Sequence, residues 1–262
     1  PFEEPRLRRV GRPKRGAPRR PIERVWHMAY VGTVTFHDGQ GDALHTIRYG
    51  RVPGRGCEDL VSDMAGDVKV ALATCPDLVV VLLSDGAKEM VDALDSGINE
   101  ATIGTAPHRL IDFWHVVEKL GAAAKVIHGS GAGLVIERWR SLLLNCATAA
   151  TRICAELLAS NKRHVVVGDE QPVHAAITYL TNQASRMAFA AARAAGLPIG
   201  SGNVEATCKS LVGQRLVRTG SRWKESTAQH IIDLRALALS DRFDAAMNHT
   251  LTHSVRRLER VA

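Results

Sequence analysis

The stretch that decides the fold class is Leu78-Val79-Val80-Val81-Leu82-Leu83-Ser84-Asp85-Gly86. A continuous apolar run rich in valine, bounded by Pro76 and Gly86, predicts a strand that is buried on both faces. A helix over 87–94, a short strand over about 108–113 and a helix through 124 are expected next. Because strand, helix and strand follow in this order, we expect an α/β core with parallel strand pairing.

A β-hairpin is predicted upstream of this strand, over residues 25–49. Residues 26–36 are rich in Val, Thr, Tyr and Phe, residues 37–42 are of turn type, and residues 43–49 form the second strand. Apolar residues at helical spacing over 58–72 then predict a helix.

From about residue 134 onward the pattern is helical. Segments 134–160 and 173–195 are rich in Ala and Leu with a period near ~3.6 residues. The glycine-rich turn at 196–202 interrupts them, after which Asn203 is expected to cap a helix through about 212. Two amphipathic helices are predicted over 224–240 and 242–260.

The net charge of +7 over 262 residues is unevenly placed. Residues 1–24 hold nine basic and three acidic side chains, so that the other 238 residues carry a net charge of only +1. This balance favours a polyanionic partner, nucleic acid first, although a solvated linker would have the same composition.

No apolar run reaches the ~18–20 residues of a membrane span. The five cysteines show no CxxC spacing, which fits a reducing cytoplasm.

Asp85 is the first candidate for chemistry. It follows the predicted buried strand, at the end where α/β sheets bind ligands. Gly86 would allow a metal or phosphate to approach the backbone. The alternative is that Asp85 caps the following helix.

Asp112 and His115 form a second candidate, because residues at i and i+3 of a helix start share a face. Such a pair could orient a base or contribute to a metal site. The alternative is a capping aspartate and a core histidine.

Glu205 is the third candidate, a carboxylate expected in the first turn of a helix, where the helix dipole alone would favour it. The Gly200-Ser201-Gly202 turn before it is tight, as if the backbone must pass close to something. If metal chemistry occurs, carboxylate ligands indicate Mg²⁺ or Mn²⁺.

A basic run follows Glu205 and contains no acidic residue. Gly213 and Gly220 are expected to keep it loop-like. Basic residues with an interleaved aromatic suit contact with a nucleic-acid backbone, and a solvated basic face is the alternative. Its members are Lys209, Arg215, Arg218, Arg222, Trp223 and Lys224.

Four motifs occur together in one order: LSDGAK at 83–88, IDFWHVVEKL at 111–120, LPIGSGNVEATCK at 197–209 and QRLVRTGSRW at 214–223. In these motifs the chain resembles the DDE transposases of bacterial insertion sequences, in the ISKra-type branch related to Mutator-like elements. The resemblance extends from about Trp26 to Phe243.

The resemblance implies an α/β, RNase H-like core with a mixed sheet, interrupted by a large all-helical insertion. In that family two aspartates and a glutamate hold two divalent metals, Mg²⁺ or Mn²⁺, for phosphodiester displacement on DNA. Asp85 matches the second aspartate and Glu205 the glutamate, and the two would then lie within roughly 4–8 Å. Asp112 and His115 would be supporting residues. The implied parts are a disordered Arg/Pro-rich linker (1–24), the first part of the core (25–115), the helical insertion (116–200), and the last core helix with the basic run and C-terminal helices (201–262).

The family's first aspartate lies on a strand just before a segment that Pro1-Phe2-Glu3-Glu4-Pro5 matches, so this strand and aspartate are expected upstream of residue 1. Asp38 and Asp42 do not replace it, because they lie in the predicted hairpin turn. The leading hypothesis is a cytoplasmic transposase catalytic domain, nucleoid-associated when bound, that acts on transposon ends and target DNA as a possible homo-oligomer. The alternatives are an inactive remnant that at most binds DNA, and a metal-dependent nuclease without strand joining.

Overall fold

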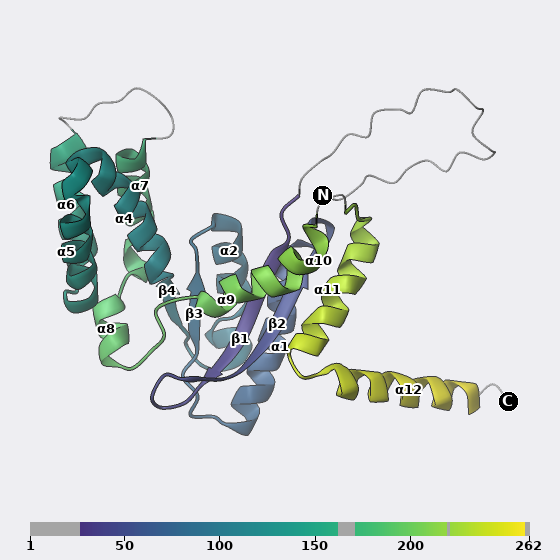
Figure 1. Ribbon diagram of the computed structural model, residues 1–262. Coiled ribbons are helices and arrows are strands. Elements are labelled where there is room, and N and C mark those ends of the chain that lie inside the picture. The colour runs from purple at the N-terminus through teal and green to yellow at the C-terminus, as the bar shows by residue number, and fades with distance from the viewer. Residues whose placement is uncertain (1–26, 162–170, 219–220, 260–262) are drawn as a thin grey trace, which may run out of the picture. The chain divides into compact units, whose positions relative to one another are not determined.

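The computed structural model describes residues 27–161, 171–218 and 221–259 (Figure 1). The linker predicted at 1–24, and Gly220 of the basic run, lie outside the described residues. The chain has an α/β fold that is mostly helical. Its strands are β1 (Tyr30–His37), β2 (Ala43–Arg51), β3 (Val81–Ser84) and β4 (His108–Ile111). Its α-helices are α1 (Gly56–Thr74), α2 (Lys88–Gly97), α3 (Glu100–Ile103), α4 (Phe113–His128), α5 (Ala132–Asn145), α6 (Ala149–Asn161), α7 (Pro172–Gln183), α8 (Phe189–Ala194), α9 (Gly202–Thr207), α10 (Gln214–Leu216), α11 (Glu225–Leu239) and α12 (Phe243–Glu259).

The chain divides into two compact units. The hairpin unit contains the strands of the hairpin, α1 up to residue 70, and everything from residue 202 onward. The helical unit contains the hairpin turn at 37–42 and residues 71–201. The strands β3 and β4 therefore group with the helices of the predicted insertion rather than with the hairpin.

The hairpin unit is organised around β2, against which α11 packs. The predicted hairpin is confirmed, and in its turn the Asp38 carboxylate accepts the amides of Gln40 and Asp42. The buried Arg51 guanidinium at the end of β2 contacts acidic residues of α1 and α11 and so joins three elements. Its partners are Asp59, Asp63 and Asp233.

The strands β3 and β4 pair in parallel, as the order of elements predicts. The buried run is shorter than expected, because β3 begins only at Val81. Leu78 and Val79 precede the strand and are 37% and 59% exposed. The prediction that the whole run is a strand buried on both faces is therefore wrong. Within the described residues the hairpin and the β3–β4 pair are two separate two-stranded sheets, rather than the single mixed sheet expected.

The described part of 113–194 consists of helices joined by short turns. The predicted helix over 134–160 is two helices, α5 and α6, and that over 173–195 ends at Gln183 and resumes as α8. Trp139, Leu143, Ile153, Leu157 and Phe189 are buried in one core with Ile111 of β4. Since this core includes a residue of the sheet, the helices and β4 fold around shared apolar contacts.

The segment after the glycine-rich turn is helical without interruption as far as Leu216. It begins as α9, continues as the π-helical segment η4 (Cys208–Gly213) and ends as α10. Two expectations are wrong here. Asn203 lies inside α9, where its side-chain amide is 3.3 Å from the Thr35 hydroxyl, and does not cap the helix. Gly213 is helical, because buried Leu211 and Leu216 on either side of it anchor the segment in the core of the hairpin unit.

No described helix is both long enough and apolar enough to cross a membrane.

Candidate functional site

Asp85 and Asp112 leave neighbouring strands at matched positions. In the parallel ladder Ser84 lies opposite Ile111, and the amide of Asp112 donates to the Ser84 carbonyl at 2.8 Å. The next residue of each strand is therefore an aspartate at the carboxyl edge of the sheet, which is where α/β proteins place ligands.

The side chain of Asp112 is fully engaged. One carboxylate oxygen accepts the His115 amide at 2.7 Å and caps α4. The other accepts both the amide and the hydroxyl of Ser201, the latter at 2.6 Å. Asp112 is only 6% exposed, so these three donors compensate the burial of its charge. The capping alternative is thus confirmed, with a second contact that the sequence did not reveal.

The tight turn before Ser201 passes close to α4, as the sequence suggested. The amide of Phe113 donates to the Ile199 carbonyl at 2.9 Å. A Cβ atom on Gly200 would lie 3.0 Å from the indole of Trp114, so a larger residue there would have to push this ring aside. Ile199, Gly200 and Ser201 are therefore fastened to the start of α4 by backbone, packing and carboxylate contacts.

Asp85 is exposed and lies in a turn held by the helices. Its Oδ1 accepts the Ala87 amide at 3.0 Å, but the residue that caps α2 is Ala87, so the interpretation of Asp85 as the helix cap is wrong. Its carbonyl accepts the Tyr179 hydroxyl of α7 at 2.8 Å. Gly86 has φ of 90°, and a Cβ atom there would lie 3.0 Å from the Tyr179 oxygen. The group that approaches Gly86 closely is thus Tyr179.

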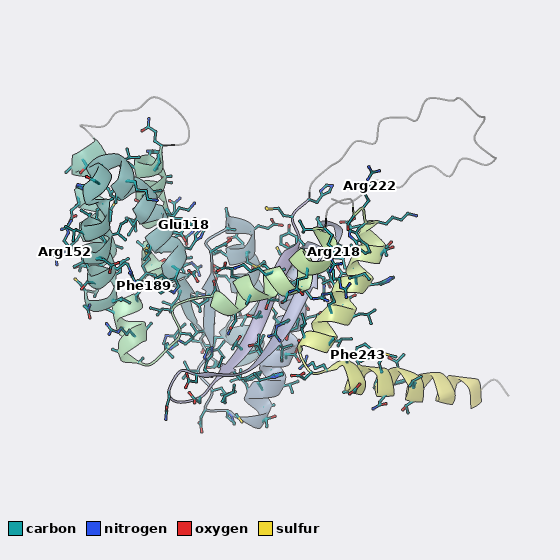
Figure 2. All side chains as sticks on the ribbon, viewed as in Figure 1. Glu118, Arg152, Phe189, Arg218, Arg222 and Phe243 are labelled. Carbon is teal, nitrogen blue, oxygen red and sulfur yellow. The ribbon has the colours of Figure 1, made fainter. Side chains whose placement is uncertain are left out.

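Tyr179 lies within the electrostatic influence of both aspartates. Burial, and after it the negative charges of Asp85 and Asp112, raise the pKa of the Tyr179 phenol well above its usual value. The ring of His115 contacts it edge-on, with centroids 5.9 Å apart. His115 is partly exposed, and its Nδ1 lies 3.6 Å from the carboxylate of Glu118, which Figure 2 labels on α4. His115 is therefore a partly exposed residue rather than the satisfied core histidine of the alternative interpretation.

Glu205 lies in the first turn of α9, in the hairpin unit. Its Oε1 accepts the Lys209 ammonium at 2.8 Å, and the two side chains are 71% and 76% exposed. This contact raises the pKa of Lys209. Lys209 is thus engaged on the same helical segment rather than unpaired, and Asp85 and Glu205 belong to different units.

The basic run contributes two arginines to a cationic cluster that a third arginine, Arg235 of α11, completes. Arg215 lies in α10, and Arg218, which Figure 2 labels, lies just after that helix; both are exposed. Burial, followed by the positive charges of these two arginines, lowers the pKa of Arg235 on α11. None of the three forms an ion pair with an acidic side chain of the described residues. We call Arg215, Arg218 and Arg235 the arginine cluster.

Trp223 is not a free aromatic surface. It is half-buried and packs against the core of the hairpin unit, which contains the buried residues Val52, Leu211 and Ile232. Its indole nitrogen is buried without a hydrogen-bond partner among the described atoms. Arg222 and Lys224 beside it are exposed. The part of Trp223 in nucleic-acid contact stays a prediction, with much of its indole covered by the core.

The described residues bring no three metal-binding side chains of the His, Cys, Asp or Glu type together. A cavity of about 490 Å³ lies elsewhere in the helical unit, and none of the candidate residues lines it. Its lining consists of Asn99, Glu100, Ala101, Ala106, Pro107 and Arg109.

Sequence reasoning missed Tyr179, Ser201 and Arg235. Only Ser201 had a signal, the tight glycine-flanked turn.

No protein-family model matches the chain, and no curated protein or solved structure matches it either.

Proposed function

We propose that the chain is the catalytic domain of a DDE-type transposase, with an RNase H-like core, that cleaves and transfers DNA strands with Mg²⁺. The observation that carries the proposal is the parallel β3–β4 pair, which presents Asp85, exposed, at its carboxyl edge. The helices α4–α8 and then Glu205 in the first turn of α9 follow in the order that the four motifs imply.

The donor chemistry of the two candidate ligands fits a hard divalent cation. Asp85 is exposed and uses one carboxylate oxygen for the Ala87 amide, which leaves the other for a ligand. Glu205 would exchange the Lys209 ammonium for the metal. Asp112 is unsuited to ligation, because both of its oxygens already accept hydrogen bonds. Mg²⁺ held by Asp85 and Glu205 would polarise the phosphodiester and lower the pKa of an attacking water.

A third carboxylate is needed, because the resemblance implies two aspartates and a glutamate around the metals. Asp38 is not a substitute. The amides of Asp42 and Gln40 lower its pKa and hold its carboxylate inside the turn.

The arginine cluster supports DNA as the substrate. Guanidinium groups that are near one another without acidic partners repel each other, and phosphate groups would relieve that repulsion. The cluster differs from the predicted set, because Arg235 is added and Trp223 is half-buried against the core.

The test is Mg²⁺-dependent nicking of supercoiled DNA by the 262-residue chain and by a longer version that includes the preceding coded residues. We expect nicking by the longer version, reduced to the metal-free level by Asp85→Ala and by Glu205→Ala. Asp92→Ala, which alters an exposed pair with Lys88, is the matched carboxylate control and should retain activity. Equal activity in all variants would refute the assigned roles. Nicking without strand joining would favour the nuclease.

The second candidate is an inactive remnant that binds DNA through the arginine cluster. The observation that favours it is the lack of any three-residue metal-binding group among the described residues. Salt-dependent DNA binding without nicking, by the longer version as well, would establish it over the transposase.

A further inference from the structure

The Asp85–Gly86 turn is fixed from outside its own strand. Two side chains of α7 donate to consecutive carbonyls of this turn, Tyr179 to Asp85 at 2.8 Å and Gln183 to Gly86 at 3.3 Å. These residues are 94 and 97 positions away in the chain. The contact therefore connects the helical segment directly to the strand end that presents the candidate carboxylate.

We propose that Tyr179 is a positioning residue for Asp85, an inference that rests on the proposed function. The hydroxyl orients the peptide between Asp85 and Gly86, since its donor must point at that carbonyl. Gly86 has a left-handed backbone conformation, and the chain turns there so that the Ala87 amide donates to Asp85 Oδ1. With Oδ1 held in this way, Asp85 presents its second oxygen in one fixed direction.

Two further features agree with a donor at this place. A phenol is protonated at neutral pH and a carbonyl oxygen can only accept, so Tyr179 is the donor in this contact, and its raised pKa agrees with that role. A Cβ atom at Gly86 would meet both the oxygen and the ring edge of Tyr179, at 3.0 and 3.1 Å. Turn and side chain are thus fitted to each other, and a larger residue at either place would separate them.

Tyr179→Phe separates positioning from simple packing, because it keeps the ring and removes only the donor. The amide of Ala87 reports the position of the Asp85 side chain through its hydrogen bond. We expect hydrogen exchange at this amide to accelerate about fivefold, the factor for one net hydrogen bond of about 1 kcal/mol. Thr181→Val is the matched control: it removes a hydroxyl from the same helix that bonds only the local Ile177 carbonyl and the Cys154 thiol. Faster exchange in Tyr179→Phe alone, with a melting temperature lowered by no more than the ~2–4 °C that one hydrogen bond explains, supports the inference, whereas unchanged exchange overturns it.

The metal response provides the second readout. In the longer version, Tyr179→Phe is expected to raise the Mn²⁺ concentration for half-maximal nicking about fivefold, with the KM for DNA unchanged. An unchanged Mn²⁺ requirement would overturn a role in catalysis. Absence of nicking by the unaltered protein would instead refute the proposed function, and the exchange measurement would still decide whether Tyr179 positions Asp85.

Discussion

Replacing Asp112 tests how the carboxyl edge of the β3–β4 sheet is held together. Asp112→Ala removes a helix cap, worth about 1 kcal/mol, and the charged acceptor of two Ser201 bonds. Because the Ser201 groups can partly rebond to water, we expect a total loss of about 3 kcal/mol of unfolding free energy. Asp112→Asn keeps the cap but leaves the Ser201 amide unpaired, for a loss of about 2 kcal/mol, and Ser201→Ala loses about 1 kcal/mol.

The assay is thermal and urea unfolding of the three variants, followed by circular dichroism. For a chain of this size the expected losses correspond to melting temperatures lower by about 2–4 °C per kcal/mol. Asp92→Ala is the control for an exposed carboxylate and should stay within about 0.5 kcal/mol. If Asp112→Asn destabilises as much as Asp112→Ala, the cap contributes nothing. If Asp112→Ala is no worse than Ser201→Ala, the shared carboxylate is not the connection that we describe.

Three further predictions concern the hairpin unit. Gly50→Ala should destabilise by about 1–3 kcal/mol in urea unfolding, because its Cβ atom would lie 2.6 Å from Ile232; a neutral effect would show that α11 can shift away from β2. The Arg242 side chain lowers the pKa of Asp67, so this pair stabilises above the unfolded-state pKa of about 3.9 and is lost as the pH falls through the lower folded-state value. Asp67→Asn should therefore lose less stability than the unaltered chain on acidification below pH ~4, and equal losses would exclude the linkage. Arg235→Ala should reduce the slope of log affinity for DNA against log salt by about 0.7–0.9, and an unchanged slope would remove it from the arginine cluster.

Elements with a local signal were predictable from the sequence. The hairpin turn and the capping role of Asp112 depend on residues within a few positions of one another. The parallel order of β3 and β4 follows from the sequence of strand, helix and strand. The length of β3 was not predictable. An apolar run implies a doubly buried strand only where both faces are covered, and Val79 is 59% exposed.

The missed parts of the site depend on contacts between distant residues. In the sequence, Tyr179 is one of many residues of a largely apolar helix, and only the fold places its hydroxyl against the Asp85 carbonyl. Arg235 lies on an amphipathic helix outside the basic run and joins the cluster only through the packing of α11. Gly213 suggested a loop, but the burial of Leu211 outweighs its poor helix propensity, which is about 1 kcal/mol less favourable than that of alanine.

The core that Ile111 shares with α4–α8 limits how this chain can be shortened. A deletion that joined residue 115 to residue 201 would leave a smaller protein with a continuous backbone. It would also strip the apolar cover from β4 and remove both donors to the Asp85–Gly86 turn. Attempts at a minimal version should therefore trim elsewhere, because the helices are integral to the sheet and cannot be removed as a cassette.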